Sequence, residues 1–115
     1  MKILAIETAT EACSAALEID NSCMYRHEIA PRKHTELILP MIDSLLKEAD
    51  IKVNSLDVIA LGCGPGAFTG VRIAIGIAQG LAFPFDIPVI PVSTLAALAQ
   101  QFSKDYNYVA TAIDA

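Results

Sequence analysis

The chain has 115 residues, of which 54% are hydrophobic and 18% charged, and its formal charge is −5. This composition excludes a disordered chain, and the length suffices for one domain with a hydrophobic core. The acidic balance argues against unaided binding of nucleic acid, which usually needs a basic surface. No apolar stretch reaches the roughly 18 residues of a membrane span, so we expect no membrane partner.

Three cysteines, Cys13, Cys23 and Cys63, form no CxxC pattern and leave one unpaired by number. We therefore expect reduced thiols in a cytoplasmic protein. Neither His27 nor His34 offers the spacing of a zinc site, and the sequence has no HxxxH or HExxH motif. No metal site is expected.

The apolar pattern first predicts three strands, at residues 2–8, 12–19 and 23–29, and then a helix at about 36–49 with Thr35 as its N-cap. A strand at 57–61 and a helix at about 69–83 follow. The pattern ends with a strand at 89–92, a helix at about 94–103 capped by Ser93, and a last strand at 108–113.

Short turns join the first three strands, so they should form an antiparallel meander, and the later helices imply right-handed parallel crossovers. The predicted fold class is α/β, with a five-stranded mixed sheet of order 3-2-1-4-5 and helices on its faces. Ribonuclease H-like and actin-like lobes have this plan. We expect residues 1–106 to form one such lobe and residues 107–115 to begin a second.

The glycine-rich segment at residues 62–70 follows a predicted strand and leads into a helix. One interpretation is a phosphate cradle, because backbone N–H groups at a helix N-terminus attract anions. However, no Lys follows the glycines as in a Walker A loop, and Pro65 removes one N–H. We favour a tight corner that needs glycine for close packing.

The helix predicted at about 69–83 has almost no polar face. Only Arg72 and Gln79 are strongly polar, while Gly76 lies between them and Gly80 beside them. Such a helix is normally covered on more than one side. We infer that a second molecule covers it, although neighbouring helices within the domain are an alternative. The sequence does not decide which face of this helix meets the sheet.

Catalytic patterns are sparse. Glu7 is the only acid placed like an active-site carboxylate, at the end of the first strand, and the following Thr8-Ala9-Thr10 lacks the glycine of phosphate-binding turns. His34 has no Ser or Cys nucleophile close in sequence.

Several segments together resemble the TsaB (YeaZ) family of bacterial tRNA threonylcarbamoyladenosine synthesis. They are ILAIETATEACSAAL, RKHTELILPMI, GPGAFTGVRIAIGIAQGLA, VSTLAALA and AIDA, in this order along the whole chain. The related catalytic protein TsaD shares the glycine loop but has a metal-binding HxxxH motif, which is absent here.

The resemblance implies a two-lobed actin-like protein with a degenerate nucleotide site and no catalysis of its own. Its partners would be TsaD and TsaE, in a complex that uses ATP to transfer threonylcarbamoyl to the adenosine beside the anticodon of ANN-decoding tRNAs. It implies only indirect contact with tRNA, and pairing through the first two helices, which can also form homodimers. The family continues into a second lobe beyond this chain.

We therefore expect a non-catalytic partner subunit that binds no cofactor alone. The expected partner interface comprises His34, Leu37, Ile38, Met41, Leu45, Arg72, Ile73, Gly76, Ile77 and Gly80. The expected degenerate phosphate-type loops comprise Glu7, Thr8, Thr10, Gly64, Gly66, Thr69 and Gly70. The alternatives are an ATP-dependent enzyme of the actin or sugar-kinase class, and a glycoprotease-like hydrolase.

Overall fold

The computed structural model describes residues 1–112. In chain order its main elements are β1 (Lys2–Glu7), β2 (Ala12–Ile19), β3 (Ser22–Ile29), α1 (His34–Glu48), β4 (Val58–Gly62), α2 (Phe68–Ala82), β5 (Val89–Val92) and α3 (Thr94–Gln100). Short 3₁₀ turns follow α1 at Val53–Ser55 and α2 at Phe83–Phe85.

The five strands form one sheet of order β3-β2-β1-β4-β5, which confirms the predicted topology. β2 is antiparallel to β1 and β3, whereas β4 is parallel to β1 and β5. The β2–β3 hairpin is tight because Asp20 and Asn21 both adopt positive φ, as a two-residue turn between twisted strands requires. The parallel pairs are joined through α1 and α2, because parallel strands need a crossover.

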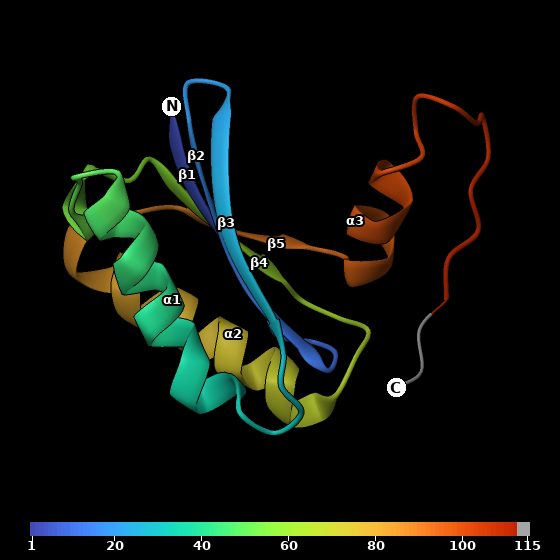
Figure 1. Ribbon diagram of the computed structural model, residues 1–115, viewed down its shortest axis with the longest axis horizontal. Helices are drawn as coiled ribbons and strands as arrows, with labels where there is room; N and C mark the ends of the chain where they lie inside the picture. The colour runs from blue at the N-terminus through green and yellow to red at the C-terminus, as the bar shows by residue number, and fades with distance from the viewer. Residues whose placement is uncertain (113–115) are drawn as a thin grey trace.

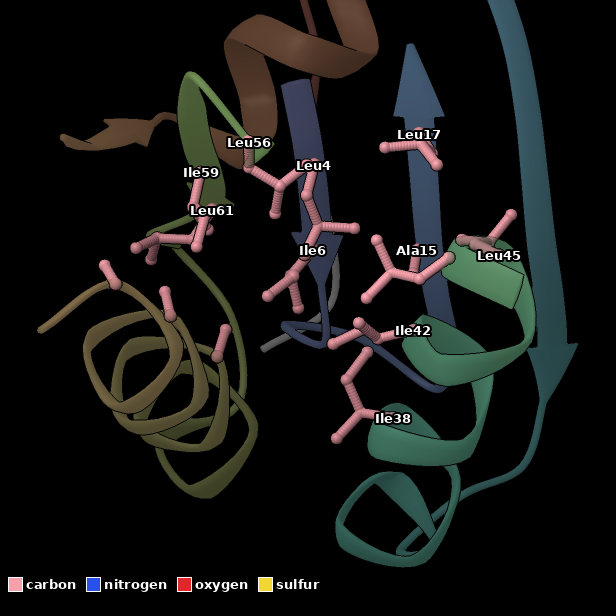
Figure 2. Close-up of a cluster of buried hydrophobic side chains, with 14 of the residues drawn as sticks. Leu4, Ile6, Ala15, Leu17, Ile38, Ile42, Leu45, Leu56, Ile59 and Leu61 are labelled. Carbon is pink, nitrogen blue, oxygen red and sulfur yellow. The ribbon is translucent and has the colours of Figure 1, made fainter. Parts of the chain in front are cut away.

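Two helices, α1 and α2, cover one face of the sheet, and α3 lies on the other side (Figure 1). The core lies between the sheet and the first two helices, where alternate residues of the central strands point inward (Figure 2). Its largest fully buried side chains are Leu4, Ile6, Leu17, Ile38, Leu45, Ile59, Thr8 and Cys13. The cysteines are free: Cys23 and Cys63 are exposed, while burial raises the pKa of the Cys13 thiol.

The start of α1 differs from the prediction. The helix begins at His34, and its N-cap is Lys33 with no side-chain cap, so Thr35 lies within the helix rather than capping it. Arg32 adopts a positive φ of 67°, which turns the chain into the helix earlier than the capping pattern suggested. Pro40 is tolerated inside α1 on its exposed side, where water can solvate the backbone.

The predicted strand at 108–113 was wrong for the residues that the structure describes. Residues 108–112 form no strand, and residue 113 lies outside the described part. A strand needs a neighbour to pair its backbone groups, and this segment lies beside α3 instead, where the Thr111 hydroxyl donates to the Leu95 carbonyl at 3.1 Å. α3 also ends at Gln100, earlier than predicted, although Ser93 caps it as expected.

One helical segment, Phe68–Phe85, is long and apolar enough to cross a membrane by length and composition. The prediction that no segment reaches this length was therefore wrong. In the structure this segment forms a layer of the α/β domain, because its Ala74, Ala78 and Ala82 are buried in the core with the sheet.

Candidate partner face and glycine-rich loops

The side of α2 that meets the sheet is built from small residues. Gly70, Ala74, Ala78 and Ala82 recur every fourth position and are buried. Side chains four apart lie on one face of a helix, so this row fixes the orientation that the sequence left open. The larger side chains of α2 are directed sideways or outward as a result.

The opposite side of α2 is open to solvent. We call it the α2 outer face, and it consists of Arg72, Ile75, Gly76, Gln79 and Gly80, with Phe68 and Phe83 at its ends. Apart from the chain neighbours and the backbone of α2 itself, no atom of the described residues lies within 4 Å of the place where a Cβ would stand on Gly76 or Gly80. Nothing within the described chain therefore requires glycine at these positions, although each weakens the helix by about 0.5–1 kcal/mol.

Two exposed aromatic rings mark the ends of the α2 outer face. Phe68 is 68% exposed and Phe83 is 88% exposed. The guanidinium carbon of Arg72 lies 3.8 Å from the centroid of the Phe68 ring, a cation–π contact that orients both side chains. Two aromatic rings and the Arg72 guanidinium thus lie on the same face of α2 as the two glycines that have no side chains.

The residues expected at a partner interface separate into three groups. Those exposed to solvent are Arg72, Gly76 and Gly80, and those partly buried against the core are Leu37, Met41, Ile73 and Ile77. Those buried within the chain are His34, Ile38 and Leu45. The last three cannot line an interface in this structure, because α1 directs its large apolar row toward the sheet.

His34 has a structural role at the start of α1. Its ring Nε2 lies 2.7 Å from the Thr10 carbonyl oxygen and 3.2 Å from that of Ala12. The ring therefore joins the beginning of α1 to the turn between β1 and β2. These carbonyl contacts account for the burial of the His34 imidazole, so no ligand is needed to explain it.

Sequence reasoning missed Ile75, Phe68 and Phe83 as exposed members of the α2 outer face. It also missed Leu39, which is 47% exposed on α1. The available signal was the glycine and alanine row at every fourth position of α2. Once that row is assigned to the sheet, the exposed side chains follow from helical geometry.

The second candidate site surrounds Glu7, where the ends of three strands meet. The Glu7 carboxylate accepts a hydrogen bond from the Ala9 N–H at 3.0 Å, and its other oxygen lies 3.3 Å from the Thr94 hydroxyl. That hydroxyl also accepts the Gly64 N–H at 3.2 Å. Sequence reasoning did not anticipate Thr94, which is distant in sequence and is brought to Glu7 by β5.

The glycines beside Glu7 allow close approach of the two loops. A Cβ on Gly62 would overlap the Glu7 carboxylate, and a Cβ on Gly66 or Gly70 would overlap the β1–β2 turn. The Ala67 N–H donates to the Ala9 carbonyl at 2.8 Å. The loops are therefore bonded to each other, as the packing interpretation of the glycine-rich segment predicts.

This arrangement bears on whether the loops fit a nucleotide phosphate. A phosphate cradle needs free N–H groups and positive charge, whereas here the Ala9, Gly64 and Ala67 N–H groups have partners within the chain and a carboxylate lies among them. The Thr8 hydroxyl likewise donates to the Gly70 carbonyl at 2.6 Å. Of the remaining loop residues, Thr69 is exposed, and the Thr10 hydroxyl accepts the Ala12 N–H at 3.4 Å. These hydrogen bonds use several of the donors that a phosphate group would need.

The family model for TsaD, tRNA N6-adenosine threonylcarbamoyltransferase, matches residues 27–115. The chain is 50% identical to a Haemophilus influenzae protein named tRNA threonylcarbamoyladenosine biosynthesis protein TsaB, and 52% identical to an Escherichia coli protein of the same name. These alignments cover 100% and 87% of the chain. The chain belongs to the TsaB (YeaZ) family.

Solved structures agree with this assignment. YeaZ from Pseudomonas aeruginosa superposes with a TM-score of 0.86 at 50% identity over 90% of this TsaB-family chain and 49% of the YeaZ chain. Thermus thermophilus RuvC, solved in complex with a Holliday junction substrate, superposes with a TM-score of 0.57 at 11% identity over 90% of this chain and 70% of RuvC. The second likeness is one of fold alone, and both identify the ribonuclease H-like, actin-like fold.

The chain spans about half the length of the relatives it matches, since it covers 50% of the H. influenzae protein and 43% of the E. coli protein. The boundary between lobes near residue 106 remains a prediction.

Proposed function

We propose that this chain is the N-terminal lobe of a non-catalytic subunit in tRNA threonylcarbamoyladenosine biosynthesis, and that it binds TsaD through the α2 outer face, with TsaE joining the pair. The similarity to proteins named TsaB supports the pathway. The single observation that carries the binding surface is the pair of exposed glycines, Gly76 and Gly80, on a helix face that also exposes large apolar side chains.

The energetics favour a covered α2 outer face. Ile75, Phe68 and Phe83 expose apolar surface that water solvates poorly, and burial of such surface contributes about 25 cal/mol per Å². The absence of side chains on Gly76 and Gly80 would let a partner helix approach closely, since no atom of the chain occupies that space. The expected members Leu37 and Met41 of α1 instead line a groove beside Arg26 on β3, so they are not part of the α2 outer face.

The chemistry of the complex would be provided by its other subunits. In the loops around Glu7, the N–H groups of Ala9, Gly64 and Ala67 have internal partners, which supports the proposal that this chain alone binds no nucleotide and that ATP is used elsewhere in the complex. A formal charge of −5 supports indirect rather than direct contact with tRNA.

The test is the Gly76→Leu variant of the full-length protein, mixed with TsaD of the same organism and analysed by size-exclusion chromatography with mass detection. We expect loss of the complex, because a leucine would occupy the space open to the partner. Gly76→Ala adds one methyl group and should retain more binding. Ala96→Leu adds a leucine to an exposed helical position of α3, on the other side of the sheet, and should leave binding unchanged.

Retention of wild-type affinity by Gly76→Leu would contradict the proposed surface. A self-association that Gly76→Leu abolishes, with TsaD binding intact, would instead assign the face to a homodimer. Calorimetry of the full-length protein with Mg-ATP addresses the rival enzyme, since tight binding with turnover would favour an ATP-dependent activity. Metal analysis of the purified protein addresses the glycoprotease-like rival.

A further inference from the structure

The edge strand β3 has backbone groups that no strand of the described chain pairs. Within the sheet β3 has β2 as its only neighbour. The Ala30 N–H, just past the end of β3, donates to the Glu11 carbonyl at 3.1 Å and so points toward the β2 side. Backbone groups alternate in direction along an antiparallel strand, so every second residue of β3 directs its N–H and C=O groups away from the sheet. These residues are Cys23, Tyr25, His27 and Ile29.

The side chains of β3 differ between its two faces. Tyr25 and Ile29 lie on one face and are 70% and 68% exposed. Arg26 and Glu28 alternate with them and line a groove of about 390 Å³ beside α1. The free edge of β3 is therefore flanked by large apolar side chains on one face and by opposite charges on the other.

The two charges of β3 are held differently within the chain. The Arg26 guanidinium is fixed, because its Nη2 lies 3.1 Å from the Glu48 carboxylate and its Nε donates to the Ser44 hydroxyl at 3.2 Å. Glu28 is exposed and forms no ion pair with any described residue. A guanidinium carries five N–H donors, so Arg26 keeps donors for a second carboxylate. β3 thus presents a fixed cation and a free anion.

We propose that β3 pairs antiparallel with β3 of a second copy of this chain, about a two-fold axis at His27. The outward backbone groups of Tyr25 would then bond those of Ile29 in the other copy, and the two His27 residues would bond each other. In the same register, Arg26 of each copy lies directly opposite Glu28 of the other. That pair is of the non-hydrogen-bonded type, in which opposing side chains approach most closely.

The charges select this register over its neighbours. An axis at residue 26 would place Arg26 opposite its own copy, and an axis at residue 28 would do the same for Glu28. Like charges directly opposite each other destabilise a strand pair, whereas opposite charges stabilise it. An axis at Tyr25 or at Ile29 would leave Arg26 and Glu28 apart. The axis at His27 pairs both charges and also places the exposed Tyr25 opposite the exposed Ile29.

The pattern of β3 favours a second copy over an unrelated strand, because one stretch of sequence supplies both halves of every pair. The surface is also separate from the α2 outer face, since α2 packs against β1, β4 and β5. Pairing through β3 would leave the α2 outer face free for TsaD. Failure of either proposal therefore leaves the other standing.

The first test is sedimentation of the full-length protein alone over a range of concentrations. Glu28→Arg should weaken self-association at least about tenfold, because the symmetry replaces two ion pairs with like charges at once. Glu18→Arg makes the same charge change at an exposed position of β2, outside the pairing, and should leave association unchanged.

A wild-type protein that stays monomeric at all concentrations would overturn the proposal, as would undiminished association of Glu28→Arg. A dimer that Gly76→Leu dissociates and Glu28→Arg does not would assign self-association to the α2 outer face instead, which also overturns pairing through β3.

The second test examines the register by disulfide formation in the full-length protein with Cys23→Ser and Cys63→Ser. His27→Cys should link two copies under mild oxidation, because Cα atoms of a hydrogen-bonded pair lie about 5.5 Å apart, within disulfide reach. Tyr25→Cys should not, because position 25 lies opposite position 29 and the two copies of position 25 are about 14 Å apart along the strands.

The background protein without an introduced cysteine is the control for crosslinks through other thiols. Equal crosslinking of both variants, or none for His27→Cys, would refute the register. Unchanged thermal melts show that the variants are folded, and the sedimentation of Glu28→Arg decides alone if His27→Cys does not fold.

Discussion

The helices α1 and α2 lie side by side on one face of the sheet and are equally long, yet they use opposite kinds of residue to contact it (Figure 1). α1 buries large side chains, namely Ile38, Ile42, Leu45 and Leu46. α2 buries a row of glycine and alanine, namely Gly70, Ala74, Ala78 and Ala82.

The difference determines what each helix presents to solvent. α1 turns its charged residues outward, including Asp43 and Lys47, which form an ion pair at 2.8 Å. α2 packs four small residues on the sheet, and its outward side presents Ile75 together with two further glycines. A helix that packs through small residues can thus belong to the core on one side and offer a partner surface on the other.

The largest expected effect is on the buried row of α1. Leu45→Ala should lower the free energy of unfolding by about 2–5 kcal/mol, because it removes a fully buried side chain and leaves a cavity. Chemical denaturation measures this. Leu39→Ala on the same helix is the matched control, since its side chain is 47% exposed and should cost far less. Equal losses of unfolding free energy would contradict the placement of Leu45 in the core and Leu39 on the exposed side of α1.

The next effect compares two glycines within α2. Gly70→Ala should lower the free energy of unfolding by about 1–3 kcal/mol, because the added Cβ would overlap the Thr8 backbone carbonyl and the backbone must shift. Gly76→Ala has open space and should raise stability by about 0.5–1 kcal/mol through helix propensity. The same denaturation experiment on both variants checks the opposite signs. Stabilisation by Gly70→Ala would disprove the close contact.

The smallest effect concerns the exposed ion pair of α1, which α2 lacks in the described chain. The hydrogen bond to Asp43 raises the pKa of Lys47 above its usual 10.5, so the folded protein holds this proton more tightly. The pair's contribution is complete below pH 10.5 and is lost as the pH rises through the folded-state pKa. Asp43→Asn should cost little at neutral pH, and its effect should vanish in high salt. Thermal melts in low and high salt measure this.

Much of the fold was predictable because it depends on local patterns. The alternation of apolar residues located β2 and β5 at their observed bounds, and the short turns and intervening helices set the strand order. The predicted strand at 108–113 failed because apolar residues of this kind also occur where no neighbouring strand is available.

The candidate sites were only partly predictable. Gly76 and Arg72 are exposed in the structure, and their expected place at a partner interface stays a prediction. Ile38 and Leu45 were wrongly placed at a partner interface, since an apolar helix face is the same whether a sheet or a partner covers it. Thr94 was missed because it contacts Glu7 across 87 residues of sequence.

The sequence alone determined the strands, their order and the positions of the glycines, because turns, periodicity and chain connectivity are local properties. The tertiary structure decided which side of α2 meets the sheet, and that the loops around Glu7 bond to each other. Both decisions depend on how closely distant segments approach, which is set by the volumes of side chains on both surfaces and cannot be read from either segment alone.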